Sequence, residues 1–554
     1  MKRHIAIILL AAAGLTGVSC NSLLDLTPRD RVSDIVMFSD VQSAEYAVND
    51  IVSYTYNIFA SWPSSVGLTE AFTDQLKYGS YVNFAYALIP SQVAYGGTNL
   101  TTNFVDVYLG CWGSLYSAIR RTNEAIDNLH KLGTNLPEAD VTRLEGELLL
   151  MRGWLYFELV KRYKEVILYD EDLSQIVPDK ALSTEEEGWN FIEQDLKDAA
   201  ARLPLRSAAA GRLDKGVAYA VTSRAMLYAG RNQAVVDAVD SLTALGYQLE
   251  ANYADAFTKS LAAGNKETIF QYSWSYSDNI THSFDFYYTP GGDYALAEQI
   301  GGGYGTPTQE MVESYELATG GKPDWTAWHS TTTVDPPYAL LEPRFQATIL
   351  YNGAAWKGRT IEPYVGGIDG FCTWNREPQP NGRTTTGYYL RKMVDETHDI
   401  SKRAESIQHF VVLRYGESLL NKAEACYKLA DYPGANNCVR AVRARAGLPF
   451  TDLSGEALWN AIRQERKIEL AYEGHWYWDL RRWGDADKAY PQGLNGYQVH
   501  GLKIEKDPDT GVFTYNYVSV DDQDRNFPAK MYRFPLPESE INSNKLVEQY
   551  PEWN

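Results

Sequence analysis

The stretch ERKIELAYEGHWYWDLRRWGD, residues 465–485, decides the fold because it crowds aromatic and charged side chains into a segment of helical periodicity. Apolar side chains recur there at spacings of three and four residues, so on a helix they form one wide stripe along a single face. The members of the stripe are Ile468, Ala471, Tyr472, His475, Trp476, Leu480 and Trp483. This pattern predicts a helix whose apolar face is buried.

Three glutamates spaced four residues apart line a second face of the same stretch, and three arginines are available to pair with them. The glutamates are Glu465, Glu469 and Glu473, and the arginines are Arg466, Arg481 and Arg482. One interpretation is a pair of catalytic carboxylates, and the other is a buried face tied by ion pairs. Carboxylates that face arginines stay ionised and make poor general acids. We therefore predict a structural core in this stretch.

Helical periodicity recurs in two blocks of the chain. The first block predicts helices over 41–59, 111–129, 141–163, 189–203, 215–230 and 232–245, and the second over 410–430, 433–447 and 456–474. Short links join neighbouring helices, and small residues occupy helix-packing positions. This organisation resembles tetratricopeptide-type stacking of helical pairs, although no regular repeat is present.

Between the two blocks, Gly, Pro, Thr, Tyr and Trp become frequent and helical periodicity fades. Short β-prone pieces occur over 267–274 and 344–353, and the tail after residue 485 is irregular. We predict a mainly α fold, a scaffold of helical pairs with a long loop-rich insertion that contains short β-strands. The expected segments are a helical half over 20–250, a ligand-binding insertion over 251–404, scaffold helices over 405–484 and an irregular segment over 485–554.

The amino terminus has the features of an export signal. Lys2 and Arg3 precede an apolar run that is too short to span a bilayer, and small residues lead into Cys20. This arrangement predicts a signal peptide over 1–19 and a bacterial lipobox, with lipid attached to the sulfur of Cys20. The alternative is an ordinary secretory signal with an incidental cysteine. A lipid would anchor the chain to a membrane without spanning it.

The formal net charge of −20 at pH 7 argues against nucleic acid as a partner, because the chain and a nucleic acid would repel each other. The sequence contains no HExxH zinc motif, G-x-S-x-G elbow or Walker loop. Acidic segments at 505–511 and 521–526 lack the EF-hand arrangement of ligands, so we interpret them as solvated turns. We expect no catalytic residues, no metal site and no cofactor, apart from an incidental Ca²⁺ ion. Cys426 and Cys438 are expected to be buried thiols.

Seven segments in order along the chain carry a resemblance to the SusD/RagB family of outer-membrane nutrient-binding lipoproteins from Bacteroidetes. They are CNSLLDLTP (20–28), WGSLYSAIRRTN (112–123), GELLLMRGWLYFELVKRY (146–163), LRYGESLLNKAEA (413–425), VRARAGLP (442–449), ERKIELAYEGHWYWDLRRWG (465–484) and FPLPESEINSNKLVEQYP (534–551). One departure is Trp476, which stands where the family usually has Arg. The resemblance implies one SusD-like domain over 20–554 on the outer surface of the cell outer membrane.

Sugar recognition requires flat apolar faces and polar side chains, which Trp and Tyr combine at low entropic cost. The chain has 14 Trp and 39 Tyr, many of them in predicted loops. The resemblance implies a glycan site built from the loop before the W-x-x-L-Y helix and from the insertion. The candidate residues there are Trp62, Tyr81, Tyr95, Asn99, Trp274, Tyr276, Tyr287, Trp325, Trp328 and Trp374. For each aromatic, the alternative is core packing.

The function that the resemblance implies is capture of an oligosaccharide or polysaccharide and delivery to a SusC-like TonB-dependent transporter. Three alternatives remain open at this point. The same fold can bind peptides, as RagB-like proteins do. A surface glycoside hydrolase would require two carboxyl groups about 5–10 Å apart around one sugar site. A structural adaptor would bind the transporter and no soluble ligand.

Overall fold

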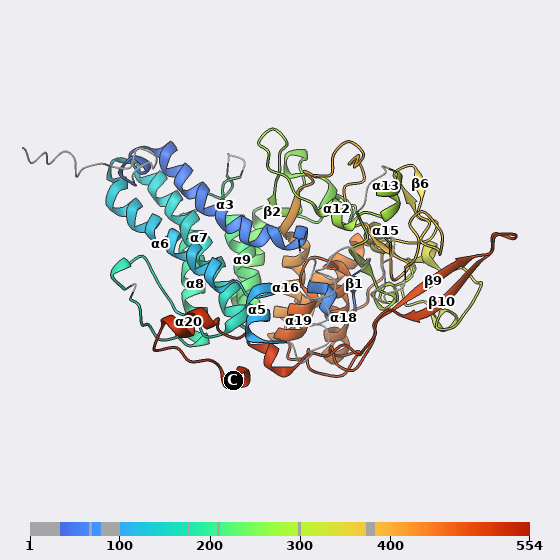
Figure 1. Ribbon diagram of the computed structural model, residues 1–554. Coiled ribbons are helices and arrows are strands. Elements are labelled where there is room, and N and C mark those ends of the chain that lie inside the picture. Colours follow the sequence, from blue (N-terminus) through green and yellow to red (C-terminus); the bar gives the residue numbers. More distant parts are fainter. Residues whose placement is uncertain are drawn as a thin grey trace, which may run out of the picture.

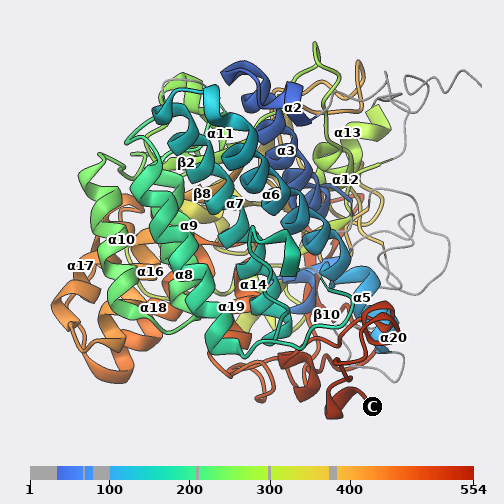
Figure 2. The same cartoon turned by 90° about the vertical axis from the view of Figure 1, so that its left-hand side faces the viewer.

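The computed structural model describes residues 34–65, 69–78, 100–175, 177–207, 211–296, 301–372 and 383–554. The helices of the first block lie side by side on the left of Figure 1 and face the viewer in Figure 2. They are α2 Asp34–Met37, α3 Val41–Ser65, α5 Thr102–Tyr108, α6 Trp112–Leu132, α7 Glu138–Tyr163, α8 Glu185–Arg202, α9 Lys215–Tyr228 and α10 Asn232–Ala244. From α6 to α10, each helix contacts the next one along the chain. The helices predicted from periodicity in this block are confirmed.

The second block continues the stack with α16 Tyr415–Lys428, α17 Tyr432–Arg445 and α18 Gly455–Glu469. Helix α10 contacts α16, and α16 contacts both α17 and α18. The chain therefore leaves the stack after α10 and rejoins it at α16. This arrangement confirms the mainly α scaffold of helical pairs with an insertion between its two blocks.

The insertion contains short helices and short antiparallel strands. Its elements are α11 Asp255–Thr258, β2 Thr268–Tyr272, α12 Phe284–Tyr288, α13 Gly291–Leu296, β3 Gly305–Pro307, α14 Gln309–Val312, α15 Pro343–Thr348, β4 Ile349–Leu350, β5 Ala355–Trp356, β6 Arg359–Thr360, β7 Tyr389–Leu390 and β8 Phe410–Arg414. The described strand pairs here are β2–β8, β4–β7 and β5–β6, and β3 pairs with β1 Leu76–Tyr78. The β2–β8 pair holds the two ends of the insertion together.

Two predicted boundaries are wrong at the ends of these elements. The helix predicted over 410–430 begins only at Tyr415, because the β-branched run before it pairs with β2 as strand β8. The strand predicted over 344–353 begins as helix α15, with Pro343 in its first turn, and becomes strand β4 only at Ile349.

The prediction of an irregular tail is also wrong in part. After α19 Trp476–Arg482, strands β9 His500–Lys506 and β10 Phe513–Ser519 form the hairpin at the right of Figure 1. Residues 507–512 form its turn, in which the Asp507 carboxylate accepts hydrogen bonds from Thr510. The acidic segment at 505–511 is thus a hairpin turn. Beyond it, the chain returns to the end of α7, where Phe534 N–H donates to the Arg162 carbonyl oxygen, and then continues into α20 Glu538–Ser543.

The opening stretch is not one helix. Helix α18 ends at Glu469 and α19 begins at Trp476, and a turn with Tyr472 at φ 62° and Gly474 at φ 78° separates them. The left-handed backbone at two positions redirects the chain, which periodicity alone does not reveal. The apolar residues of its stripe are nevertheless buried as predicted except Trp483, which is half-buried, and Tyr472 is fully buried.

Burial of the stretch confirms the structural interpretation, but the predicted ion-pair partners are wrong. The three glutamates pair with cations from distant segments. Glu465 contacts Arg344 and Arg443, Glu469 contacts Arg344, Arg414 and Arg445, and Glu473 contacts Arg414 and Lys392. Burial alone would raise the pKa of Glu469, but Arg445, Arg414 and Arg344 together hold it well below its usual value. The carboxylate is therefore permanently ionised.

The three local arginines have other roles. Arg466 binds Asp479 at 2.8 Å, and Arg482 binds Glu424 at 2.5 Å. Arg481 donates to the carbonyl oxygens of Met531 and Tyr532 and lies over the ring of Trp478. These arginines therefore tie the stretch to α16 and to the carboxy-terminal segment.

Two hydrophobic clusters surround these charges. The first fills the helical stack and includes Cys426 and Cys438, which are buried free thiols as predicted. The second fills the insertion and includes Tyr472, so the turn after α18 joins the scaffold to the insertion.

Replacing Glu469 by Gln should lower the free energy of unfolding by about 3 kcal/mol or more, because it removes one of the carboxylates that compensate the buried Arg414 and Arg445 and leaves excess positive charge in the core. Chemical denaturation measures the change. The matched control is Glu124→Gln, which removes an exposed pair with Arg120 and should cost less than about 1 kcal/mol.

The same experiment has a pH dependence of known sign. Because the pKa of Glu469 is lower in the folded than in the unfolded chain, the stability it contributes is present at neutral pH. The difference between wild type and Glu469→Gln should begin to shrink as the pH falls below 4.5, the ordinary pKa of Glu. A difference that grows on acidification would contradict this assignment.

Candidate ligand-binding site

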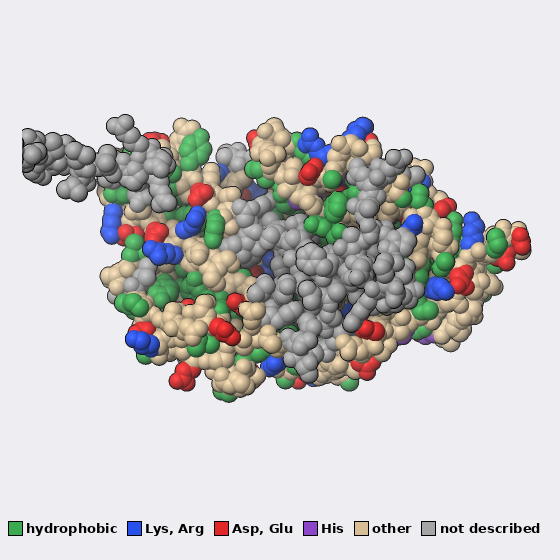
Figure 3. Space-filling model, viewed as in Figure 1, with side chains coloured by type: hydrophobic (Ala, Val, Ile, Leu, Met, Phe, Trp, Pro, Cys, Tyr) green, Lys and Arg blue, Asp and Glu red, His purple; other side chains and the backbone are tan. Residues whose placement is uncertain are grey.

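Four aromatic side chains meet beside the short helix α12, and we call them the α12 aromatic cluster: Phe286, Tyr287, Tyr294 and Tyr304. The ring centroids of Tyr287 and Tyr304 are 4.7 Å apart, and Phe286 contacts both rings. Phe286 and Tyr287 are half-buried, whereas Tyr294 is buried and Tyr304 is 8% exposed. In Figure 3, hydrophobic side chains gather on the surface at the position of α12.

A glycine run brings Tyr304 against α12. The N–H of Gly302 donates to Phe286, and the N–H of Tyr304 donates to Tyr287, each to the carbonyl oxygen. Gly302 has φ +77°, and a Cβ atom at this position would collide with the Thr289 carbonyl oxygen. Only glycine permits both the backbone angle and the close approach.

Buried ion pairs give the cluster a rigid base. Arg359 contacts Asp293 at 2.6 Å and Asp369 at 2.7 Å, and Asp369 also accepts a hydrogen bond from Gly292 N–H. The indole N–H of Trp356 donates to Asp293. Although burial would raise the pKa of Asp293, Arg359 and its neighbours lower it, so the charge persists. Helix α13, which carries Tyr294, is thereby fixed.

The cluster offers hydroxyl groups as well as ring faces. Neither Tyr287 nor Tyr304 has a side-chain hydrogen bond with another described residue. Burial, with a smaller effect of Tyr287, raises the pKa of Tyr304 to about 12, so its hydroxyl stays protonated and can donate or accept. Flat rings with free hydroxyls are suited to polar ligands that have apolar faces, such as sugars.

The carboxylates nearest the cluster are already engaged. Asp285 is fully buried and lies 2.8 Å from Nδ1 of His398, and Asp293 is held by Arg359. A glycoside hydrolase requires one protonated and one ionised carboxyl group that both reach the sugar. Asp285 and Asp293 therefore do not form such a pair.

Strand pairing brings chain segments that are distant in the sequence next to the cluster. Tyr78, the last residue of β1, is opposite Gly305 in β3, next to Tyr304. The hydroxyl of Thr385 lies 3.5 Å from both the Tyr78 carbonyl oxygen and the Thr306 hydroxyl. Helix α3 also contacts α12. The fold thus joins the insertion to the segment before α6 at this point.

Six of the predicted residues cannot be compared with the structure. Tyr81, Tyr95, Asn99, Trp374 and Cys20 lie outside the described residues, and of Trp62 only its backbone position in α3 is described. Of the remaining candidates, Tyr287 belongs to the α12 aromatic cluster.

Trp274 and Tyr276 lie elsewhere, in the segment between β2 and α12. Trp274 is half-buried against the ring of His282, with centroids 4.4 Å apart. Tyr276 is exposed, its hydroxyl donates to the Glu405 carbonyl oxygen, and Arg403 covers one ring face at 4.0 Å. Within the described part of the chain, no ring contact joins these residues to Tyr287.

Trp325 and Trp328 do not form an exposed platform. Their rings contact each other at 5.5 Å, they are 5% and 9% exposed, and both belong to the core of the insertion. The indole N–H of Trp328 donates to the Val334 carbonyl oxygen. Trp328 is therefore a core residue and not part of a binding surface. Trp325 is a core residue that also lines a pocket.

Phe286, Tyr294 and Tyr304 are cluster members that the sequence did not predict. The signal for Tyr304 is present in GGGYG (301–305), because a tyrosine within a glycine run is placed where two backbones approach closely. The partner segment is not evident from the sequence, since the contact joins residues that only the folded insertion brings together.

The fold and the cluster together define a class of protein: a scaffold of helical pairs that carries an aromatic cluster on a long insertion. The chain belongs to the SusD family, whose model matches residues 266–553. A second family model, described as "Starch-binding associating with outer membrane", matches residues 32–227.

Individual relatives agree with this assignment. The chain is 24% identical over 400 residues to SusD-like protein P2 of Formosa agariphila, covering 69% of this chain and 73% of that protein. The crystal structure of a SusD-like protein from Bacteroides fragilis is 26% identical, with a TM-score of 0.75 and coverage of 93% and 98% of the two chains. A laminarin-binding SusD-like protein is 22% identical, with a TM-score of 0.60 and coverage of 92% and 98%.

The helices can also be compared with the requirements for crossing a membrane. Within the described residues, none of them combines the length and the apolar character that crossing a bilayer requires.

Replacing Gly302 by Ala should lower the free energy of unfolding by clearly more than the same change at Gly230. Both residues have positive φ, but a Cβ atom at Gly302 meets the Thr289 carbonyl oxygen, whereas at Gly230 it meets nothing within 4 Å. We expect about 1 kcal/mol at Gly230 from backbone strain alone and more at Gly302. Thermal denaturation of the two variants measures the difference, and equal costs would show that the close approach is absent.

Proposed function

We propose that this protein binds an oligosaccharide or polysaccharide at the cell surface, with the α12 aromatic cluster as part of the binding site. The observation that carries the proposal is the half-buried ring of Tyr287 packed against Tyr304, which is 8% exposed, with both hydroxyls free and a rigid base below them. The starch-binding description of the second family model and the laminarin-binding neighbour support a carbohydrate as the ligand class.

The cellular role follows from the family and the amino terminus. We infer that lipid on Cys20 anchors the protein to the outer face of the outer membrane, where it delivers its ligand to a SusC-like TonB-dependent transporter. The description of the second family as associating with the outer membrane supports this location.

We propose a binding protein and not an enzyme. The carboxylates nearest the cluster, Asp285 and Asp293, are buried and paired with His398 and Arg359. Although burial would raise it, Arg359 and its neighbours lower the pKa of Asp293, so this carboxylate lacks the raised pKa that a general acid needs. Long incubation with a glycan and a reducing-sugar assay tests this, since steady product formation would show hydrolysis.

Tyr287→Ala and Tyr304→Ala should each weaken glycan binding by about 1–3 kcal/mol, because each removes a ring from the proposed contact surface. Isothermal titration with starch and laminarin oligosaccharides measures the affinities. Binding should be insensitive to salt, since a neutral glycan releases no counterions.

The matched control is Tyr46→Ala, which removes a 60% exposed tyrosine from α3. It should leave affinity and stability unchanged. If both cluster variants bind like wild type while a peptide library shows saturable binding, the ligand is a peptide and the carbohydrate proposal is wrong.

Cys20→Ala should release a folded protein from the membrane, because we propose its thiol as the lipid attachment point. Fractionation of cells that lack the partner transporter measures this, and circular dichroism of the released protein checks its fold. Cys111→Ala is the control and should remain membrane-associated. Sedimentation of Cys20→Ala with outer membranes would contradict the anchor.

A further inference from the structure

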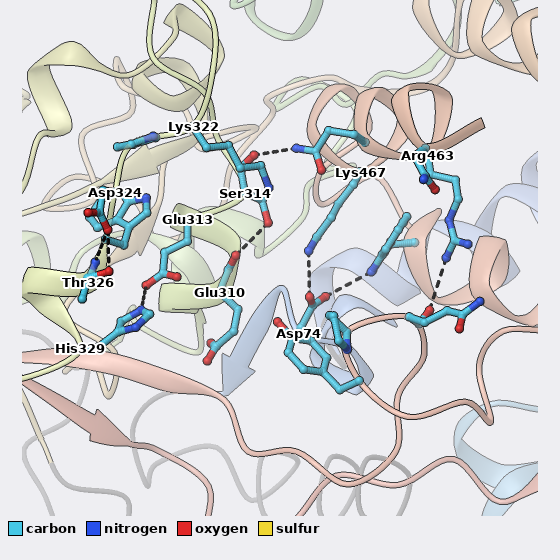
Figure 4. Close-up of a pocket in the computed structure, with 18 of the residues that line it drawn as sticks. Asp74, Glu310, Glu313, Ser314, Lys322, Asp324, Thr326, His329, Arg463 and Lys467 are labelled. Atoms are coloured by element: carbon cyan, nitrogen blue, oxygen red, sulfur yellow. Dashed lines mark hydrogen bonds and ion pairs between the residues drawn. The ribbon is translucent and has the colours of Figure 1, made fainter. Parts of the chain in front are cut away.

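A second concave site lies on the insertion side of α18, in a cavity of about 790 Å³ that we call the α18 pocket (Figure 4). Its walls come from α18, from α14, from the segment around Lys322 to His329, and from Tyr490 to Gln492. The volume is within the range of about 300–1,000 Å³ that small-molecule sites occupy. The pocket does not include the α12 aromatic cluster.

Most carboxylates that line the pocket already have partners. Asp74 accepts from Lys467 at 2.8 Å and from the indole N–H of Trp476 at 3.2 Å. Glu313 contacts His329 at 2.8 Å, Glu310 contacts His500 at 2.6 Å, and Asp324 accepts from Thr326 at 2.6 Å. Figure 4 shows several of these contacts around the pocket. Each of these four carboxylates therefore already has a cation or a hydrogen-bond donor beside it.

Lys322, at the rim, is a cation without a matching partner. Among the described residues, no hydrogen bond or ion pair reaches its ammonium group. The Lys322 side chain is exposed to solvent on one side, while desolvation by the pocket walls lowers its pKa and the nearby charge of Lys467 lowers it further. The carboxylates around it do not fully compensate these effects. An anion bound here could form an ion pair with this ammonium group.

Trp325 provides a second unused donor. The side chain lines the pocket and is 5% exposed, yet its indole N–H has no hydrogen-bond partner in the described part of the chain. A buried donor without an acceptor is unfavourable, so such groups generally have a ligand or water to satisfy them. Lys322 and Trp325 are thus two hydrogen-bond donors, three residues apart in the sequence, that have no acceptor among the described residues.

The other walls suit a sugar ring. The exposed side chains of Asn460, Gln492 and Glu456 can exchange hydrogen bonds with ring hydroxyls, and Tyr490 presents a half-buried aromatic ring. A small inorganic anion would leave most of the volume unfilled.

We propose that the α18 pocket binds an acidic saccharide, whose anionic group accepts hydrogen bonds from Lys322 and Trp325. The anionic group is a carboxylate or a sulfate on the sugar. This site is separate from the neutral-glycan site at α12, and its binding weakens with increasing salt because an ion pair forms.

Titration calorimetry with trigalacturonate, its methyl ester and a sulfated κ-carrageenan tetrasaccharide tests the proposal. Wild type should bind at least one of the two anionic sugars, and the neutral ester should bind roughly tenfold more weakly than trigalacturonate if the carboxylate is the preferred group. Lys322→Met should weaken anionic-sugar binding roughly tenfold, and Lys322→Arg should retain it. Trp325→Phe keeps a buried ring, removes the N–H, and should weaken binding severalfold.

Two control variants test whether the loss of binding is specific to this pocket. Lys545→Met makes the same charge change at an exposed lysine outside the pocket and should have no effect. Tyr287→Ala should leave acidic-sugar binding intact, so a failure of the α12 proposal is distinguishable from a failure here. Lack of binding to both anionic sugars, unchanged affinity in Lys322→Met, or stronger binding of triglutamate than of either sugar would overturn the proposal.

Discussion

The structure depends on a buried charge cluster around Arg414. Its guanidinium contacts Glu267 at 2.8 Å, Glu469 at 2.7 Å and Glu473 at 2.7 Å, and all four side chains are nearly inaccessible to solvent. Glu267 and Arg414 flank the two ends of the insertion, whereas Glu469 ends α18 of the scaffold. One set of ion pairs therefore joins both ends of the insertion to the helical stack.

Such a cluster serves specificity more than net stability, because desolvation offsets most of the attraction between buried charges. Here the cluster fixes the position of the insertion relative to α18. Since each carboxylate accepts from two or more cations, a shift of the insertion against α18 would leave charges unpaired, and such shifts are strongly disfavoured. The α12 aromatic cluster and the α18 pocket both use this fixed join between insertion and scaffold.

The sequence predicts the features that depend on local periodicity. The long helices α3, α6 to α10 and α16 to α18 follow from apolar spacing, and burial of 465–485 follows from its stripe. It does not predict contacts between distant segments: Glu469 pairs with Arg414 and Arg445, and Arg466 pairs with Asp479. For the same reason the sequence identifies Tyr287 as a candidate but not its partner Tyr304.

The strong negative charge of the chain affects ligand binding differently at the two proposed sites. With a net charge of −20, the surface as a whole repels anions, whereas neutral glycans approach it without an electrostatic penalty. An aromatic site such as the α12 cluster suits the neutral class, because stacking and hydroxyl contacts need no charge. An acidic sugar needs a local cation that is not already neutralised. Among the cations that line the α18 pocket, Lys467 is held by Asp74 and Arg463 by Asp485, which leaves Lys322 to provide that charge.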